Sequence, residues 1–118
     1  MALRLLIADD HEATRLGVRA LIAHKRDWHV CGEAATGIEA VQKVVELNPD
    51  VVILDLSMPE MNGFEAAEHI SECSPSTKII FFSMHEVPAS ARMVGGHAFV
   101  AKSTAAQELV SAIERLIN

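Results

Sequence analysis

The sequence is a chain of 118 residues, of which half are hydrophobic and 22% are charged, with a formal net charge of −6. This length and composition indicate one soluble globular domain with a buried core, and they leave too little chain for a second domain of ordinary size. The ten Lys and Arg residues are scattered, which argues against binding of nucleic acid or an anionic membrane by this domain's own surface. No apolar run approaches the roughly 20 residues of a transmembrane helix, and we expect a cytoplasmic location.

Strand and helix signals alternate five times along the chain. Short apolar runs predict strands at 4–8, 28–34, 51–54, 78–82 and 98–101. Apolar residues at three- and four-residue spacing predict helices at 11–24, 36–47, 64–73 and 104–117, and Pro88 with Gly95-Gly96 predicts a short helix at 88–94. Such alternation with short connections predicts a mainly parallel sheet with helices on both faces.

Polar side chains follow four of the predicted strands. They are Asp9 and Asp10 after the first strand, Asp55 after the third, Ser83 after the fourth and Lys102 after the fifth. Because the carboxyl ends of parallel strands meet at one edge of a sheet, these side chains should converge.

Three carboxylates at one edge repel one another. At about 4 Å and an effective dielectric near 20, each pair costs roughly 4 kcal/mol, so one is protonated or a cation lies among them. Oxygen ligands suit Mg²⁺, which usually completes its octahedron with phosphate oxygens. Lys102 and Ser83 are suited to a phosphoryl group beside the metal, with Asp55 as the nucleophile.

The chain resembles, over its whole length, the receiver domain of bacterial two-component response regulators, within the LuxR/NarL-FixJ-like branch. The stretches that carry the resemblance are Ile7-Ala8-Asp9-Asp10-His11, Gly32-Glu33-Ala34-Ala35-Thr36-Gly37, Asp55-Leu56-Ser57-Met58-Pro59-Glu60-Met61-Asn62-Gly63, Ser83-Met84-His85 and Phe99-Val100-Ala101-Lys102. The resemblance implies a flavodoxin-like (βα)5 three-layer sandwich with sheet order 2-1-3-4-5. It also implies Mg²⁺-dependent phosphorylation of Asp55 by a sensor histidine kinase.

The resemblance assigns a role to each site residue. Asp10 and Asp55 would bind Mg²⁺ directly, Asp9 would bind it through water, and the backbone carbonyl of Ser57 would complete the protein ligands. Lys102 and Ser83 would contact the phosphoryl oxygens, and Phe99 would be an aromatic switch that follows Ser83. The new negative charge would bias a two-state element, so the domain would be a signalling switch with at most self-phosphorylation and autodephosphorylation activity.

The same resemblance leads us to expect that residues 1–118 are a receiver domain whose C-terminal helix-turn-helix output domain is absent from this chain. DNA would be contacted only through that missing domain, to regulate transcription. The sensor histidine kinase is the expected partner, and a homodimer is an open alternative to a monomer.

Three features depart from the family pattern. The segment from Ser83 to Lys102 is shorter than usual by about three residues, close to one helical turn. Ala98 stands where a glycine is usual, and Gly96 where an alanine is usual. We therefore hypothesise intact phosphorylation chemistry and an altered output surface around residues 88–94.

Other functions remain open at this point. A hydrolase with an aspartyl-phosphate intermediate usually has a second aspartate two residues after the nucleophile, where this chain has Ser57. A receiver-like interaction module that no longer signals by phosphorylation is a further alternative. His11 either lies solvated beside the crevice or influences the lifetime of the phosphoryl group.

Overall fold

The computed structural model describes residues 2–84 and 96–117, so the expected helix at 88–94 lies outside the described residues. The strands are β1 (Leu3–Ala8), β2 (Trp28–Ala34), β3 (Val51–Asp55), β4 (Lys78–Ser83) and β5 (Ala98–Ala101). The α-helices are α1 (Glu12–Ile22), α2 (Gly37–Leu47), α3 (Gly63–Cys73) and α4 (Ala105–Ile117). These elements match the predicted ones within a few residues at each end.

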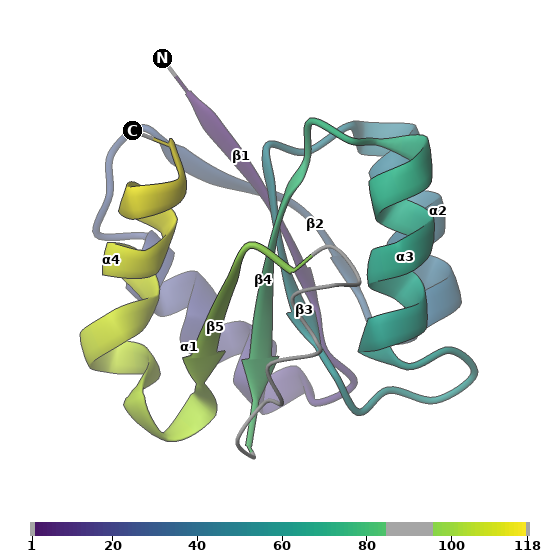
Figure 1. Ribbon diagram of the computed structural model, residues 1–118. Helices are drawn as coiled ribbons and strands as arrows, with labels where there is room; N and C mark the ends of the chain where they lie inside the picture. The colour runs from purple at the N-terminus through teal and green to yellow at the C-terminus, as the bar shows by residue number, and fades with distance from the viewer. Residues whose placement is uncertain (1, 85–95, 118) are drawn as a thin grey trace.

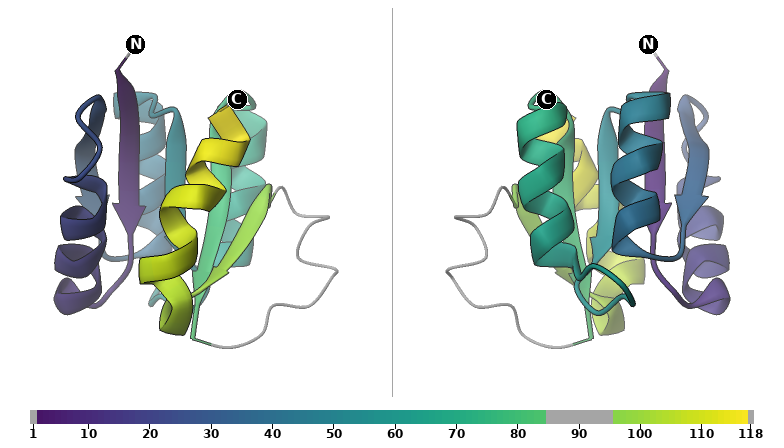
Figure 2. Two further views of the ribbon diagram at one scale, coloured as in Figure 1. Left: turned by 90° about the vertical axis from the view of Figure 1, so that its left-hand side faces the viewer. Right: turned by 90° about the vertical axis from the view of Figure 1, so that its right-hand side faces the viewer.

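The five strands form one parallel sheet in the order β2-β1-β3-β4-β5. Helices α1 and α4 cover one face of the sheet, and α2 and α3 cover the other (Figures 1 and 2). This confirms the predicted flavodoxin-like three-layer fold with order 2-1-3-4-5.

The central strand β3 is buried along its whole length, as its apolar sequence predicts. Alternate residues of the strands feed two separate clusters. Leu6, Leu54 and Phe81 pack toward α2 and α3, whereas Leu5, Ile53 and Ile80 pack toward α1 and α4. The two cores hold the strands in fixed register, so the residues at their carboxyl ends have defined positions.

Local signals explain the ends of α2. The side chain of Thr36 accepts a hydrogen bond from the backbone N–H of Glu39 (3.0 Å), as the Thr-x-x-Glu pattern predicts. The Glu39 carboxylate accepts from the N–H of Ala35 at 2.7 Å. At the other end, Asn48 adopts a left-handed conformation with φ of 48° and stops the helix.

The start of α4 differs from the prediction. Residues Lys102–Thr104 form a 3-10 turn before the α-helix begins at Ala105. The hydroxyl of Thr104 donates to the carbonyl oxygen of Ala101 at 3.3 Å. The sequence predicts a helix at 104–117, but Thr104 belongs to the turn that leads from β5 into α4.

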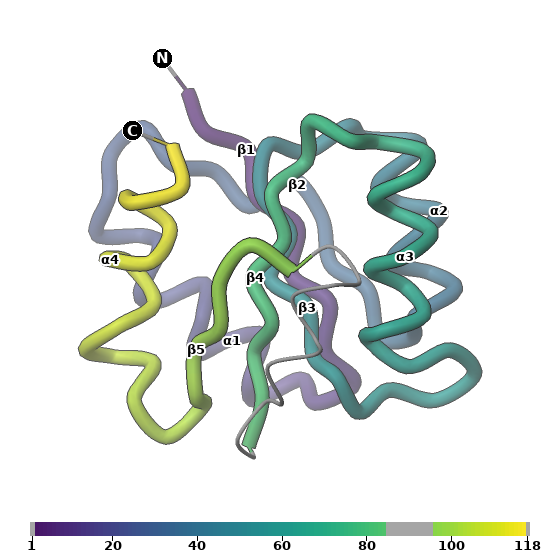
Figure 3. Tube along the Cα trace, in the orientation of Figure 1, coloured from purple at the N-terminus to yellow at the C-terminus, as the bar shows by residue number. Residues whose placement is uncertain are grey.

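All the strands run in the same direction, so their carboxyl ends share the lower edge of the molecule in Figure 1. The beginning of β1 and the last turn of α4 lie at the opposite edge (Figure 3). In the sheet, Asp55 pairs with Phe82 of β4, and Ser83 pairs with Ala101 of β5. The chain thus brings its polar strand-end residues to one edge, as predicted.

Candidate functional site

Two carboxylates are buried at the carboxyl edge of the sheet. Asp9 follows β1 and is 1% exposed, and Asp55 ends β3 and is 3% exposed. Asp10 lies beside them and is an exposed residue. Carboxylates are rarely buried unless they are paired, so a compensating group is required.

Lys102 supplies part of that compensation. Its Nζ forms an ion pair with Oδ2 of Asp9 at 2.7 Å, although the angles do not meet those of a hydrogen bond. The same Nζ lies 3.5 Å from Oδ1 of Asp55. The lysine side chain is 9% exposed and passes over the ring of Phe82 at 5.8 Å from the centroid. One ammonium group therefore serves two buried carboxylates.

The loop after β3 fixes the orientation of Asp55. The backbone N–H of Ser57 donates to Oδ1 of Asp55 at 3.2 Å, and the N–H of Gly63 donates to the carbonyl oxygen of Leu56 at 3.0 Å. A side chain at Gly63 would collide with the backbone at Asp55 and would lie 2.7 Å from Cα of Leu56. The glycine thus lets α3 start against the end of β3.

Charge and burial raise the pKa of Asp55. Desolvation by burial is the largest cause, and the carboxylates of Asp9 and Asp10 act in the same direction. The Ser57 N–H and the Lys102 ammonium oppose the shift but do not cancel it. The site therefore resists a negative charge on Asp55, and a further cation would relieve this cost.

The donor set fits a divalent cation. Asp9, Asp10, His11 and Asp55 each offer a ligand atom, and these atoms lie within 4.8 Å of one another. Oδ2 of Asp55 is buried and has no hydrogen-bond partner among residues 2–84 and 96–117. A buried carboxylate oxygen in an acidic group is suited to a hard cation such as Mg²⁺.

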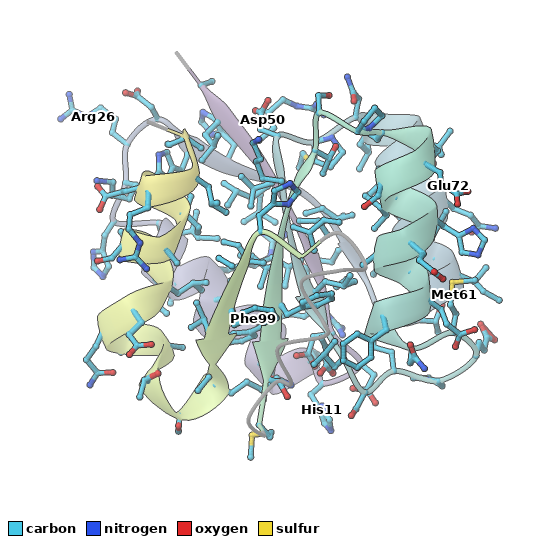
Figure 4. The ribbon with its side chains drawn as sticks, viewed as in Figure 1. His11, Arg26, Asp50, Met61, Glu72 and Phe99 are labelled. Atoms are coloured by element: carbon cyan, nitrogen blue, oxygen red, sulfur yellow. The ribbon has the colours of Figure 1, made fainter. Side chains whose placement is uncertain are left out.

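The two expected switch residues lie on β4 and β5, the strands that follow β3 in the sheet. Ser83 is 7% exposed at the end of β4. Phe99 is half-buried on β5, and its ring stacks on that of Phe81 with centroids 5.6 Å apart (Figure 4). Phe81 also contacts Phe64 at 5.5 Å, so an aromatic row connects β5 with α3.

Sequence reasoning missed Arg15 of α1. Its Nη1 donates to the backbone carbonyl oxygen of Asp9 at 2.6 Å, and its Nε forms an ion pair with Glu33 of β2 at 2.8 Å. Arg19 also pairs with Glu33, at 2.5 Å. Arg15 thus fixes the turn that carries Asp9. In the sequence, the only indication of this role is that Arg15 and Arg19 lie one helical turn apart on α1.

An open parallel α/β sheet with an acidic group and one lysine at its carboxyl edge defines the class of this protein: a receiver-type signalling domain. The family model for the response regulator receiver domain matches residues 5–114. The chain belongs to this family and is the receiver domain of a response regulator of two-component signalling.

Relatives place it near the LuxR/NarL branch. The transcriptional regulatory protein YhcZ of Bacillus subtilis is 41% identical over 111 residues, which cover 92% of this chain and 52% of that protein. A LuxR-family response regulator from Aurantimonas is 36% identical with a TM-score of 0.92 and coverage of 99% and 86%. The receiver domain of NarL from Mycobacterium tuberculosis is 30% identical with a TM-score of 0.90 and coverage of 98% and 95%.

The match to YhcZ spans about half of that relative's length. Receiver domains generally act as signalling modules rather than as enzymes. Within the described part of the chain, the structure contains no helix of the length and apolar character that a membrane span requires.

Proposed function

We propose that this domain is a phosphorylation-controlled switch in which Asp55 accepts a phosphoryl group from a sensor histidine kinase. The observation that carries the proposal is the buried carboxylate of Asp55, whose Oδ2 has no hydrogen-bond partner in the described ranges. This residue groups with Asp9 and Asp10, and its Oδ1 lies 3.5 Å from Nζ of Lys102. The Oδ2 atom is available as a nucleophile, because no hydrogen bond occupies its lone pairs.

In the proposed transfer, Oδ2 of Asp55 forms a bond to phosphorus while the bond between phosphorus and the donor's imidazole nitrogen breaks. The electron pair leaves with that nitrogen. Mg²⁺, held by Asp10, Asp55 and the backbone carbonyl of Ser57 and through water by Asp9, would neutralise charge on the phosphoryl oxygens. Lys102 would turn from Asp9 and Asp55 toward the new phosphoryl oxygens.

The proposed readout passes through β4 and β5. Ser83 would move to donate a hydrogen bond to the phosphoryl group, and Phe99 would swing inward as Ser83 moves. The stacking of Phe99 on Phe81 supports a ring that has a defined resting position. The altered output surface around residues 88–94 stays a prediction, because that segment is outside the described residues.

The whole protein is proposed to regulate transcription through a DNA-binding domain that residues 1–118 do not contain. The name of YhcZ, a transcriptional regulatory protein about twice as long as the matched region, supports this. The kinase partner, homodimer formation and a cytoplasmic location stay predictions.

Intact-mass spectrometry tests the proposal. The wild-type domain, mixed with MgCl₂ and a small phosphodonor such as phosphoramidate, should gain the mass of one phosphoryl group, and EDTA should prevent the gain. Asp55→Asn should show none. An equal gain on Asp55→Asn, or none on the wild type, would contradict the proposal and favour an interaction module; steady release of phosphate from a small phosphomonoester would favour a hydrolase.

A further inference from the structure

His11 lies directly after the two aspartates of the β1 end and precedes the first residue of α1. Its backbone N–H donates to Oδ1 of Asp9 at 2.9 Å. Its Nδ1 lies 3.0 Å from Oδ1 of Asp10 and 3.3 Å from Oδ1 of Asp9. Figure 4 shows His11 at the lower edge of the molecule, where the carboxyl ends of the strands meet.

The imidazole is placed at the acidic group and not at the helix end. The helix-capping position of His11 shows no side-chain hydrogen bond to α1 within the described ranges. The side chain is 67% exposed, so the ring could extend into solvent, yet it turns back toward the aspartates. The Nδ1 atom of His11 therefore contacts the carboxylates of Asp9 and Asp10.

Two arrangements produce such contacts. In one, Nδ1 carries a proton and donates to the carboxylates. In the other, the lone pair of Nδ1 and the carboxylate oxygens face a common cation. Ligands at right angles, each about 2.1 Å from an octahedral ion, are about 3.0 Å apart. The distance of 3.0 Å from Nδ1 of His11 to Oδ1 of Asp10 matches that edge length.

A second observation points to a cation at the same place. The carboxylate of Asp55 is buried, and its Oδ2 has no hydrogen-bond partner in the part of the chain that the structure describes. Asp55 also belongs to the same group of candidate ligand residues as His11. A proton on His11 adds no partner to Asp55, whereas a shared cation would compensate the buried charge of its carboxylate.

We propose that Nδ1 of His11 is a ligand of the cation that Asp10 and Asp55 would bind directly and Asp9 through water, and that it gives this site a preference for a borderline transition ion such as Ni²⁺ over Mg²⁺. The reason is the donor chemistry: carboxylate and water oxygens suit Mg²⁺, whereas an imidazole nitrogen suits Ni²⁺ and related ions. This inference rests on the metal site of the proposed function and specifies its selectivity.

Isothermal titration calorimetry on the untagged chain tests the inference with NiCl₂ and MgCl₂ in separate titrations. Loss of a ligand weakens metal binding by about tenfold or more. His11→Ala should therefore raise the Kd for Ni²⁺ at least tenfold and leave the Kd for Mg²⁺ within about twofold. His69→Ala, on the exposed side of α3, is the matched control and should change neither value at this site.

The opposite outcome is equally defined. If His11 only donates to the carboxylates, His11→Ala removes a competitor, and both ions bind equally well or equally better. An unchanged ratio of the two Kd values with intact Mg²⁺ binding would overturn the inference alone. Failure of the folded wild type to bind either ion would overturn the proposed metal site as well. Thermal melts of each variant establish that it is folded.

Discussion

The ammonium of Lys102 lies closer to Asp9 than to Asp55, at 2.7 Å against 3.5 Å. In the absence of a phosphoryl group, the lysine therefore compensates mainly the carboxylate that is most deeply buried. It also competes with a divalent ion, because both cations would be held by the carboxylate groups of Asp9 and Asp55.

Replacing Lys102 with Met should lower stability and strengthen Mg²⁺ binding together. Removing one member of a buried ion pair costs about 3 kcal/mol, because the remaining charges are left unpaired. Urea unfolding in EDTA should show this loss, and calorimetry should show a lower Kd for Mg²⁺. Lys25→Met, which removes an exposed pair with Glu114, should change stability by no more than about 1 kcal/mol and leave Mg²⁺ binding unchanged. Weaker Mg²⁺ binding in Lys102→Met would contradict the competition.

The sequence predicted the convergence of Asp9, Asp10, Asp55 and Lys102 because it depends only on strand order and direction. Apolar runs such as 51–54 reveal the strands, and parallel pairing then places their ends at one edge. The Thr36 cap was equally readable, since its partner Glu39 lies three residues away in the chain.

Side-chain geometry between distant elements was not readable in the same way. The position of Lys102 in the sequence does not show whether it contacts Asp9 or Asp55, since these two residues lie at the ends of the neighbouring strands β1 and β3. The 3-10 turn at Lys102–Thr104, which follows β5 directly, gave no signal in the spacing of apolar residues. The link from Arg15 to Asp9 and Glu33 depends on the packing of α1 against β2.

Asp55→Asn should stabilise the metal-free domain. Burial, with Asp9 and Asp10, raises the pKa of Asp55, so this group contributes stability below its unfolded value of about 3.9 and loses it as pH rises through the folded value. Ionisation of Asp55 is therefore unfavourable in the folded state, and the neutral amide removes that cost. Calorimetry in EDTA should show a higher melting temperature, by about 4 °C for each kcal/mol of added stability.

Magnesium and pH provide the controls for that variant. MgCl₂ should raise the melting temperature of the wild type more than that of Asp55→Asn, and the advantage of the variant should shrink as the pH approaches 4. Asp50→Asn is a matched substitution at the opposite edge (Figure 4), where Asp50 accepts from the backbone N–H of Arg4 at 2.8 Å. It should not stabilise. A lower melting temperature for Asp55→Asn in EDTA would contradict the electrostatic interpretation.

His97 should make stability sensitive to mild acid. Nδ1 of the His97 ring accepts a hydrogen bond from the backbone N–H of Ile79 at 2.9 Å. The backbone N–H of His97 donates to the carbonyl oxygen of Ile79 at 2.8 Å, so His97 extends the pairing of β5 with β4. Partial burial lowers the pKa of His97, and Lys78 lowers it further. The contribution is complete above the unfolded pKa of about 6.5 and is lost as pH falls through the folded value.

Urea unfolding from pH 8 to pH 5 measures this dependence. The wild type should lose stability below about pH 6.5. His97→Asn offers an acceptor oxygen that does not titrate, so it should flatten the profile while keeping most of the stability at pH 8. An identical slope for the two proteins would show that other groups carry the pH dependence.

Gly96 and Phe81 fit each other by size. A Cβ at Gly96 would lie 2.6 Å from Cδ2 of Phe81 and still closer to Cε2. Gly96→Ala should therefore destabilise the domain by about 1–3 kcal/mol, the usual cost of overpacking.

Phe81→Leu alone should also destabilise the domain, because it leaves a cavity beside Phe64 and Phe99. The double variant should be more stable than the sum of the two losses predicts, since the smaller side chain accommodates the new methyl group. Chemical unfolding of the four proteins forms a double-mutant cycle, and strict additivity would contradict the size match.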